Sequence, residues 1–271
     1  MKQKRTLWIG LLCCSVLGSA ASLHSDTGQA WNGYLQRARP ESSTGPDVSG
    51  GESSARSETT WHSLQQGRIL VRPATKPNPV PVPSGLIHDW IGQILFPRTT
   101  LDHVLQVVLD HNRYREFYAP LIVESKTLSR GADQTEFSLV MQNRSLFSKA
   151  AVATRYTEQV RRLAPNRVQI ITQSSSIEEI ENYGSTTPRV LSPEESSGYL
   201  WRLYSVAQYQ QRSEGVVLQL EVISLSRDVP RTLRWMVDPL IRHVAESTLQ
   251  ISLERTRQAV ENQNEEVAGT P

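Results

Sequence analysis

A run of strand-like segments followed by one long amphipathic helix is the feature that most constrains the fold of this chain. Several segments within residues 121–225 alternate apolar and polar side chains and are separated by turn residues, which is typical of antiparallel strands with one buried face. The sequence then predicts a helix that restarts at Asp238 and Pro239 and continues to about Glu261. Its apolar side is formed by Leu240, Ile241, Val244, Ala245, Leu249 and Leu253. A sheet and a helix of this kind can bury both apolar surfaces by packing against each other.

The segment before this run supplies the remaining elements. Residues 90–96 indicate a first strand that Pro97 ends. An apolar stripe over residues 101–109 predicts a helix, with Thr99 and Asp102 as its capping box. A second short helix follows and ends at Pro120. We therefore predict an α+β fold in which a curved antiparallel sheet wraps around the long C-terminal helix, with two short helices after the first strand.

The N-terminus carries the signature of an export signal. A basic start is followed by an apolar run over residues 7–17 and by small residues at 18–21, where cleavage is expected. The alternative is an uncleaved membrane anchor. Both cysteines, Cys13 and Cys14, lie inside the apolar run. After removal of residues 1–21, the exported chain would therefore have no disulfide and no thiolate metal site.

The rest of the chain divides into three parts. Residues 22–84 are rich in Ser, Gly and Pro, so we expect a disordered linker with an edge strand at 68–72. Residues 85–262 should form the single folded domain, and residues 263–271 a disordered tail. Within the domain, the acidic stretch 178–197 is predicted to be the longest loop.

Charge and motifs exclude several classes of function. The full chain has 29 basic and 27 acidic residues, and loss of Lys2, Lys4 and Arg5 with the signal leaves 26 against 27. A net charge of −1 gives no electrostatic basis for binding nucleic acid. No hydrolase, nucleotide or zinc-protease motif is present, and the histidines lack the spacing of metal ligands. We assign no catalytic residue, no metal and no cofactor.

Candidate ligand-contacting residues come from the apolar strand faces and the terminal helix. They are Phe137, Leu139, Tyr156, Trp201, Leu203, Leu218, Leu220, Leu240, Val244, Thr248 and Ser252. Thr248 and Ser252 either face a cavity or border solvent. Tyr156, Tyr204 and Tyr209 either orient a ligand hydroxyl or belong to the core.

The sequence also predicts where four titratable residues lie. Arg202 and Glu221 fall on the outer faces of the last two strands, at a spacing that favours an ion pair of structural type. His88 and Asp89 lie beside the first strand and are either an acid–base pair or turn and surface residues.

The order of elements resembles that of the START-like (SRPBCC) superfamily, which has the helix-grip fold. The residues that carry the resemblance are 101–105, 110–114, 201–203 and 221–230, and the likeness extends over about residues 85–262. The chain looks most similar to exported bacterial members. The resemblance implies a cavity between the sheet and the terminal helix that holds a lipid-like or polyketide-like molecule. The stretch 178–197 departs from the minimal pattern and is a candidate lid.

Three functions follow as hypotheses. The first is binding or transport of a hydrophobic small molecule, in the periplasm or outside the cell. The second is a polyketide-cyclase-like enzyme that uses the same cavity and needs two titratable side chains converging inside it. The third is a scaffold with a filled core and no ligand.

Overall fold

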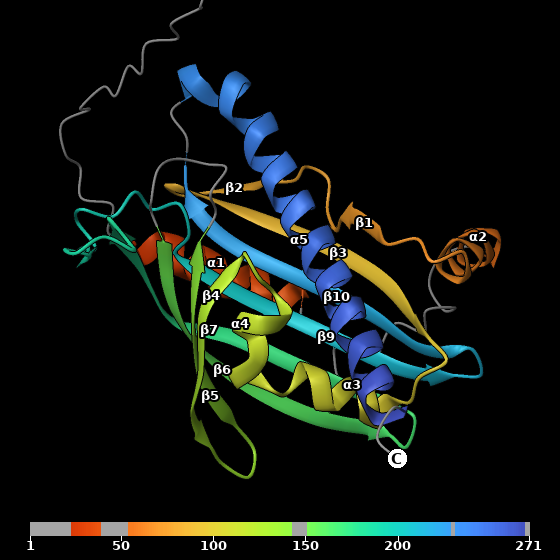
Figure 1. Ribbon diagram of the computed structural model, residues 1–271. Helices are drawn as coiled ribbons and strands as arrows, with labels where there is room; N and C mark the ends of the chain where they lie inside the picture. Colours follow the sequence, from red (N-terminus) through yellow and green to blue (C-terminus); the bar gives the residue numbers. More distant parts are fainter. Residues whose placement is uncertain (1–22, 39–53, 143–150, 229–230, 269–271) are drawn as a thin grey trace, which may run out of the picture.

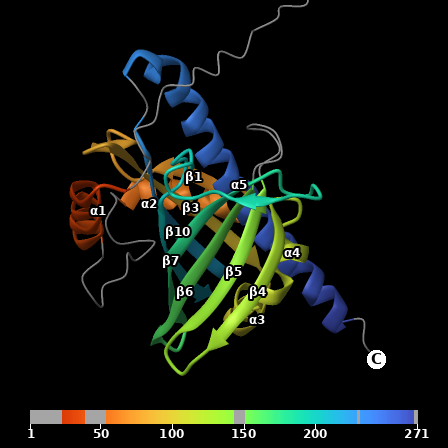
Figure 2. The ribbon, with the colours of Figure 1, turned by 90° about the vertical axis from the view of Figure 1, so that its left-hand side faces the viewer.

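One antiparallel sheet organises the molecule. The computed structural model describes residues 23–38, 54–142, 151–228 and 231–268, and of 54–57, 231–244 and 264–268 only the backbone is described. Ten strands take the order β1-β3-β10-β9-β7-β6-β5-β4, with β2 paired to β3 and β8 to β7. They are β1 (Leu70–Pro73), β2 (Val80–Val82), β3 (Gly85–Pro97), β4 (Ile122–Arg130), β5 (Thr135–Gln142), β6 (Ala151–Ala164), β7 (Arg167–Glu181), β8 (Arg189–Val190), β9 (Arg202–Arg212) and β10 (Gly215–Arg227). The sheet curls without closing, and β1 and β4 are its two edges (Figures 1 and 2).

The concave face holds the long C-terminal helix α5 (Arg231–Ala268) and three short helical elements. These are α3 (Leu101–Val108), the 3-10 turn η1 (His111–Arg113) and α4 (Tyr114–Phe117). The core between them includes Ile94, Phe96, Val104, Leu218, Leu249 and Leu253. Gly92 lets helix and sheet approach closely, since a Cβ there would lie 2.6 Å from Leu253 Cδ1. The predicted helix-grip fold is confirmed.

Helix α5 is longer than the sequence predicted at both ends. It begins at Arg231 rather than near Asp238, passes through Pro239, and continues to Ala268 instead of giving way to a disordered tail at 263. Proline removes one backbone donor, which weakens or bends a helix without always ending it. Among the described residues, no helix combines the length and the apolar character that crossing a membrane requires.

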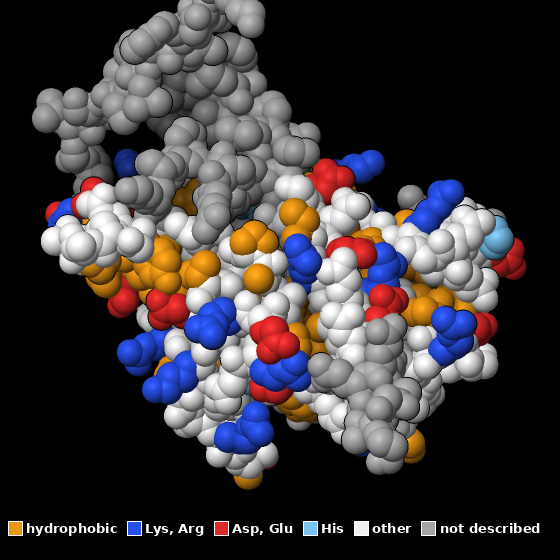
Figure 3. Space-filling model, viewed as in Figure 1, with side chains coloured by type: hydrophobic (Ala, Val, Ile, Leu, Met, Phe, Trp, Pro, Cys, Tyr) orange, Lys and Arg blue, Asp and Glu red, His pale blue; other side chains and the backbone are white. Residues whose placement is uncertain are grey.

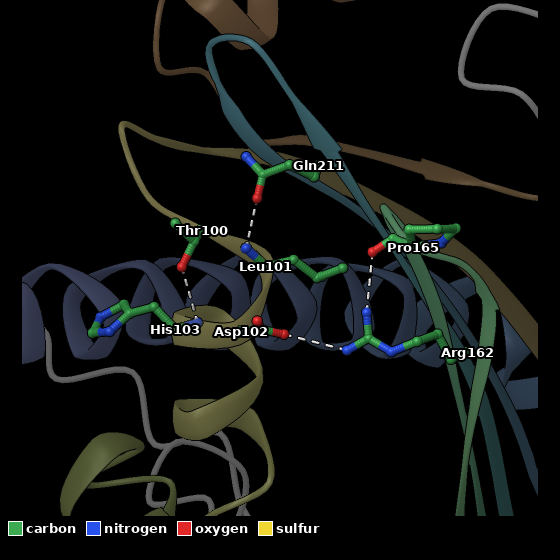
Figure 4. A network of polar contacts seen from close by, with 7 residues as sticks. All are labelled: Thr100, Leu101, Asp102, His103, Arg162, Pro165 and Gln211. Atoms are coloured by element: carbon green, nitrogen blue, oxygen red, sulfur yellow. Dashed lines mark hydrogen bonds and ion pairs between the residues drawn. The ribbon is translucent and has the colours of Figure 1, made fainter.

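Helix α3 is held in place at its first turn (Figure 4). Thr100, rather than the predicted Thr99, is the N-cap, and its hydroxyl accepts a hydrogen bond from His103 N at 3.3 Å. The Gln211 side chain of β9 accepts from Leu101 N at 2.6 Å, which satisfies another free amide of the helix start. Asp102 pairs with Arg162 of β6 at 3.2 Å. These contacts fix α3 over one end of the concave face.

The convex face is covered by two helices that the sequence did not predict. In place of the expected disordered segment 22–84, the structure has α1 (Ser25–Ala38) and α2 (Ser54–Gln65). Figure 2 shows α1 on the side of the sheet opposite α5. Trp31, Tyr34 and Leu35 of α1 share one side of the helix and pack on Ile87, Tyr204, Val206, Ile223 and Leu225. Leu64 of α2 packs on Leu95 and Val217.

Two other segments differ in detail from expectation. Strand β1 lies at the place of the edge strand expected over 68–72 and pairs with β3 along residues 90–93. Part of the loop expected over 178–197 is ordered, because β7 extends to Glu181 and β8 folds back against it. Residues 1–21 lie outside the described part of the chain.

Candidate functional site

The two ends of the concave face are packed to different degrees. At the end covered by α3 and the second half of α5, Ile94, Val216 and Leu218 are at most 2% exposed. At the other end, Leu203, Met141 and Val222 also face inward but keep part of their surface accessible. An apolar side chain that faces a covering helix and is still accessible indicates that helix and sheet are not tightly packed there. This end of the concave face, where inward-facing apolar side chains stay partly accessible, is the candidate site.

A cluster of aromatic rings packs against residues of both ends. The rings of His111 and Phe137 stack at 4.1 Å, and Phe137 stacks on Tyr156 of β6 at 5.1 Å. Tyr114 meets Tyr118 edge-on at 5.0 Å. The cluster draws its members from η1, α4, β5 and β6, so it joins the short helices to the sheet. It gives the site a wall that is apolar in bulk and carries hydroxyl groups.

The hydroxyl groups of this wall remain neutral at physiological pH. Burial raises the pKa of Tyr118 and Tyr156, and it raises the pKa of Tyr114 and Tyr209 well above the ordinary value, assisted by the nearby charge of Glu158. Tyr114 donates to Val108 O at 2.6 Å. The Tyr118 hydroxyl lies 3.0 Å from Thr256 Oγ1 of α5, so it ties α4 to the long helix.

A buried acid and base lie beside these tyrosines. His111 Nε2 is 3.2 Å from Glu158 Oε1, and the two side chains are 1% and 4% exposed. The ring is not aligned for a hydrogen bond, so within the described residues both ring nitrogens and Glu158 Oε1 lack one. These atoms are also shielded from solvent. The attraction between imidazole and carboxyl offsets part of the cost of burying them, and it links η1 to β6.

The predicted ligand-contacting residues are distributed over three places. Phe137, Leu139, Tyr156 and Leu203 lie in or against the cluster beside α4, and Leu218 and Leu220 lie under α5. Thr248 and Ser252 are half-buried on α5. Trp201 differs from expectation, because it precedes β9 and packs with the convex-face cluster. The side chains of Leu240 and Val244 lie outside the described residues.

The sequence did not predict His111, Glu158, Tyr114 or Tyr118 as site residues, although His111 and Tyr114 lie in the stretch 110–114 that carries the resemblance. A pattern in the sequence could have indicated that Glu158 is buried. Glu158 shares one face of β6 with Thr154 and Tyr156, and both of these residues are buried. No pattern in the sequence pairs it with His111, which comes from a different element. Of the three tyrosines considered, Tyr156 and Tyr209 face inward, whereas Tyr204 packs under α1.

Neither expected charged pair is formed. Arg202 is opposite Leu225 in the β9–β10 register and Glu221 is opposite Val206, which separates them by four positions, or roughly 13 Å along the strand. His88 and Asp89 are successive residues of β3 and therefore point to opposite faces. Both are buried rather than exposed. Burial lowers the pKa of His88 to about 4, so this ring is neutral at pH 7 and meets Ser226 Oγ at 3.0 Å.

Two hollows lie on the surface rather than inside the grip. One, of about 810 Å³, follows the edge strand β4 and is lined mainly by polar and charged side chains, including Arg115, Glu124 and Lys126. The other, of about 370 Å³, lies between β1 and α5. On the face seen in Figure 3, basic and acidic side chains are intermixed. Among the residues described, no group of three His, Cys, Asp or Glu side chains converges as a metal site requires.

Comparison with known proteins finds likeness in solved structures alone. No protein-family model matches the chain, and no curated protein matches it. The STAR-related lipid transfer protein from Xanthomonas axonopodis is similar at 14% identity, covering 71% of this chain and 92% of that one, with a TM-score of 0.47. The Zhui aromatase/cyclase from a Streptomyces species is similar at 11% identity, with 68% and 99% covered and a TM-score of 0.49.

A START superfamily protein from Mycobacterium smegmatis is similar at 14% identity, with 65% and 98% covered and a TM-score of 0.41. At these identities the likeness concerns the fold alone. The architecture of this chain itself is a curved antiparallel sheet gripping a C-terminal helix.

Proposed function

We propose that this protein binds a hydrophobic small molecule between the sheet and the first half of helix α5. The observation that carries the proposal is the accessible apolar surface of inward-facing residues on the concave face, notably Leu203, Leu220 and Val222. Exposed apolar surface inside a fold is unfavourable in water and becomes favourable once an apolar molecule covers it. The aromatic cluster would contribute ring surface to this site, since the hydroxyl groups of Tyr114 and Tyr118 are already engaged with Val108 O and Thr256 Oγ1.

A test by uptake of an apolar fluorescent probe follows directly. N-phenyl-1-naphthylamine should bind the purified protein and brighten. Val222→Phe adds bulk inside the proposed site and should lower uptake at least fivefold with the fold retained. Leu163→Phe is the control, because Leu163 is 41% exposed beside the hairpin that joins β6 to β7. Equal uptake by both variants, or no uptake by the wild type even after delipidation, would contradict the proposal.

Binding fits the interior better than catalysis does. His111 and Glu158 are two titratable side chains that converge inside the grip, which is what a cyclase-like enzyme would need. Their facing atoms, however, are shielded from any molecule in the interior. A general acid or base must reach the proton that it transfers. We therefore assign the pair a role in holding η1 against the sheet.

We also propose that the protein acts after export and removal of residues 1–21. The support is the basic, apolar and small-residue order of that segment. Mass spectrometry of the protein from fractionated cells tests this. The expected mature chain starts near Ser22, just before α1. An intact N-terminus in the membrane fraction would favour the anchor instead.

A further inference from the structure

Two carboxyl side chains meet on the convex face of the sheet, where helix α1 covers it. Asp89 of β3 is opposite Ile223, and Glu221 of β10 is opposite Ile91. The two acids are therefore diagonal neighbours on adjacent strands, and both point to the convex face. Asp89 is 1% exposed.

Helix α1 reaches this pair through one side chain. The Tyr34 hydroxyl donates to Asp89 Oδ2 at 2.5 Å. Asn78 holds the backbone of Asp89 from the other side, donating to its carbonyl oxygen at 2.9 Å and accepting from its amide at 3.1 Å. The second oxygen, Asp89 Oδ1, is buried and receives no hydrogen bond from the described residues. A donor is missing at this atom, and the neighbouring carboxyl of Glu221 is placed to supply one if it is protonated.

Two adjacent carboxyls, one buried at Asp89 and one half-buried at Glu221, cannot both ionise at low cost. Like charges at this separation repel strongly in a low-dielectric site, so one proton is retained between them. Burial and the charge of Asp89 raise the pKa of Glu221 to about 7, and burial raises the pKa of Asp89 as well. Arg72 of β1 acts in the opposite direction on Glu221. Burial and Asp89 raise the pKa of Tyr34, so this group is a neutral donor.

We propose that Asp89 and Glu221 form a proton-binding site whose occupancy holds helix α1 on the sheet. With the proton bound, Tyr34 docks on a carboxyl pair that carries a single negative charge. Without it, α1 must cover two charges, and its docking weakens. The inference is independent of ligand binding inside the grip, because it concerns the opposite face of the sheet.

The direction of the pH dependence follows from the raised pKa of Glu221. The docked state binds a proton more tightly than a state in which the carboxyls face water. Docking is therefore strongest below about pH 4.5 and weakens as the pH rises to about 7, above which the loss is complete. A single linked proton changes the docking equilibrium by at most about tenfold per pH unit.

Hydrogen exchange of the full chain between pH 5 and 8, corrected for intrinsic rates, measures this equilibrium. Peptides from residues 25–38 should lose protection severalfold per pH unit up to about pH 7. Peptides from α2 are the internal control, because α2 packs on the same face away from the carboxyl pair. Glu221→Gln keeps the side-chain size and removes the titration, so α1 should stay protected throughout. Tyr34→Phe should lower the protection of α1 at pH 5.

Two results would overturn the proposal. One is protection of residues 25–38 that follows the same pH course as that of α2. The other is a Glu221→Gln variant that retains the wild-type pH dependence of α1. Should Glu221→Gln fail to fold, Asp89→Asn makes the same comparison, and the wild-type pH course alone remains decisive.

Discussion

The two faces of the sheet are both covered by helices, but the coverings differ in length and in how they are held. On the concave face, α5 crosses the sheet with a repeated apolar stripe and packs Leu249, Leu253 and Val260 into a large core. On the convex face, α1 is held by Trp31, Tyr34 and Leu35 and by side-chain hydrogen bonds from Tyr34 to Asp89 and from Thr27 to Pro83 O. We therefore expect α5 to unfold only with the whole domain and α1 to open as a local unit.

The largest expected effect comes from truncating matched leucines on the two faces. Leu253→Ala should lower the free energy of unfolding by about 3 kcal/mol, because Leu253 is 1% exposed and a cavity would remain. Leu35→Ala removes the same atoms from α1. Its effect is limited by the docking free energy of α1, so we expect roughly half as much. Urea unfolding measures both. Equal losses would show that α1 and α5 unfold together.

Alanine substitutions at two glycines, one on each face of the sheet, should change stability in opposite directions. Gly92→Ala places a Cβ against Leu253 Cδ1 and should destabilise by about 1–2 kcal/mol. Gly28→Ala in α1 meets no atom within 4 Å and should stabilise by about 0.5–1 kcal/mol through helix propensity. Thermal unfolding of Gly92→Ala and exchange of residues 25–38 in Gly28→Ala measure the two. Stabilisation by Gly92→Ala would contradict the close approach.

The tyrosine wall can be tested by removing one hydroxyl. Tyr118→Phe breaks the contact with Thr256 and should cost about 1 kcal/mol, because Thr256 is buried and loses its partner from α4. Tyr199→Phe, at a tyrosine that is 47% exposed, is the control and should leave the unfolding midpoint unchanged. If Tyr118→Phe left the free energy of unfolding unchanged, the contact between α4 and α5 would not contribute to stability.

The smallest effect is expected at the start of α3. Asp102→Asn breaks an ion pair with Arg162 whose side chains are 80% and 52% exposed. Solvent screens such a pair, so the loss should stay below about 0.5 kcal/mol and vanish at 1 M salt. Melting temperatures at low and high salt check this. A larger, salt-independent loss would assign Asp102 a role beyond the ion pair.

Local pattern predicted the concave half of the molecule and missed the convex half. The alternation in β5, β9 and β10 and the stripe of α5 repeat over many residues, so the pairing of sheet and helix could be predicted. The loop between β9 and β10 was also expected, and Gly215 takes the positive φ of 144° there. Helix α1 offers three apolar contacts in a polar segment, and only a preformed sheet surface makes them sufficient.

The sequence predicted where the candidate site lies, between the sheet and the C-terminal helix, but it predicted only some of the side chains that form it. Leu203, Leu218, Leu220 and Phe137 face inward as their strand positions require. Trp201 does not, because it lies one residue before β9, outside the alternation. His111 and Glu158 come from elements 47 positions apart, and their contact is set by how η1 crosses the sheet.

The sequence by itself determined the alternation of faces along each strand, the amphipathic C-terminal helix and therefore the grip. These are properties of neighbouring residues, and periodicity records them. The tertiary structure alone decided register, and with it the meeting of Asp89 with Glu221 and the separation of Arg202 from Glu221. It also decided that α1 docks on the convex face. Register depends on how all the residues of one strand pair with those of its neighbours, so the sequence of a single strand does not determine it.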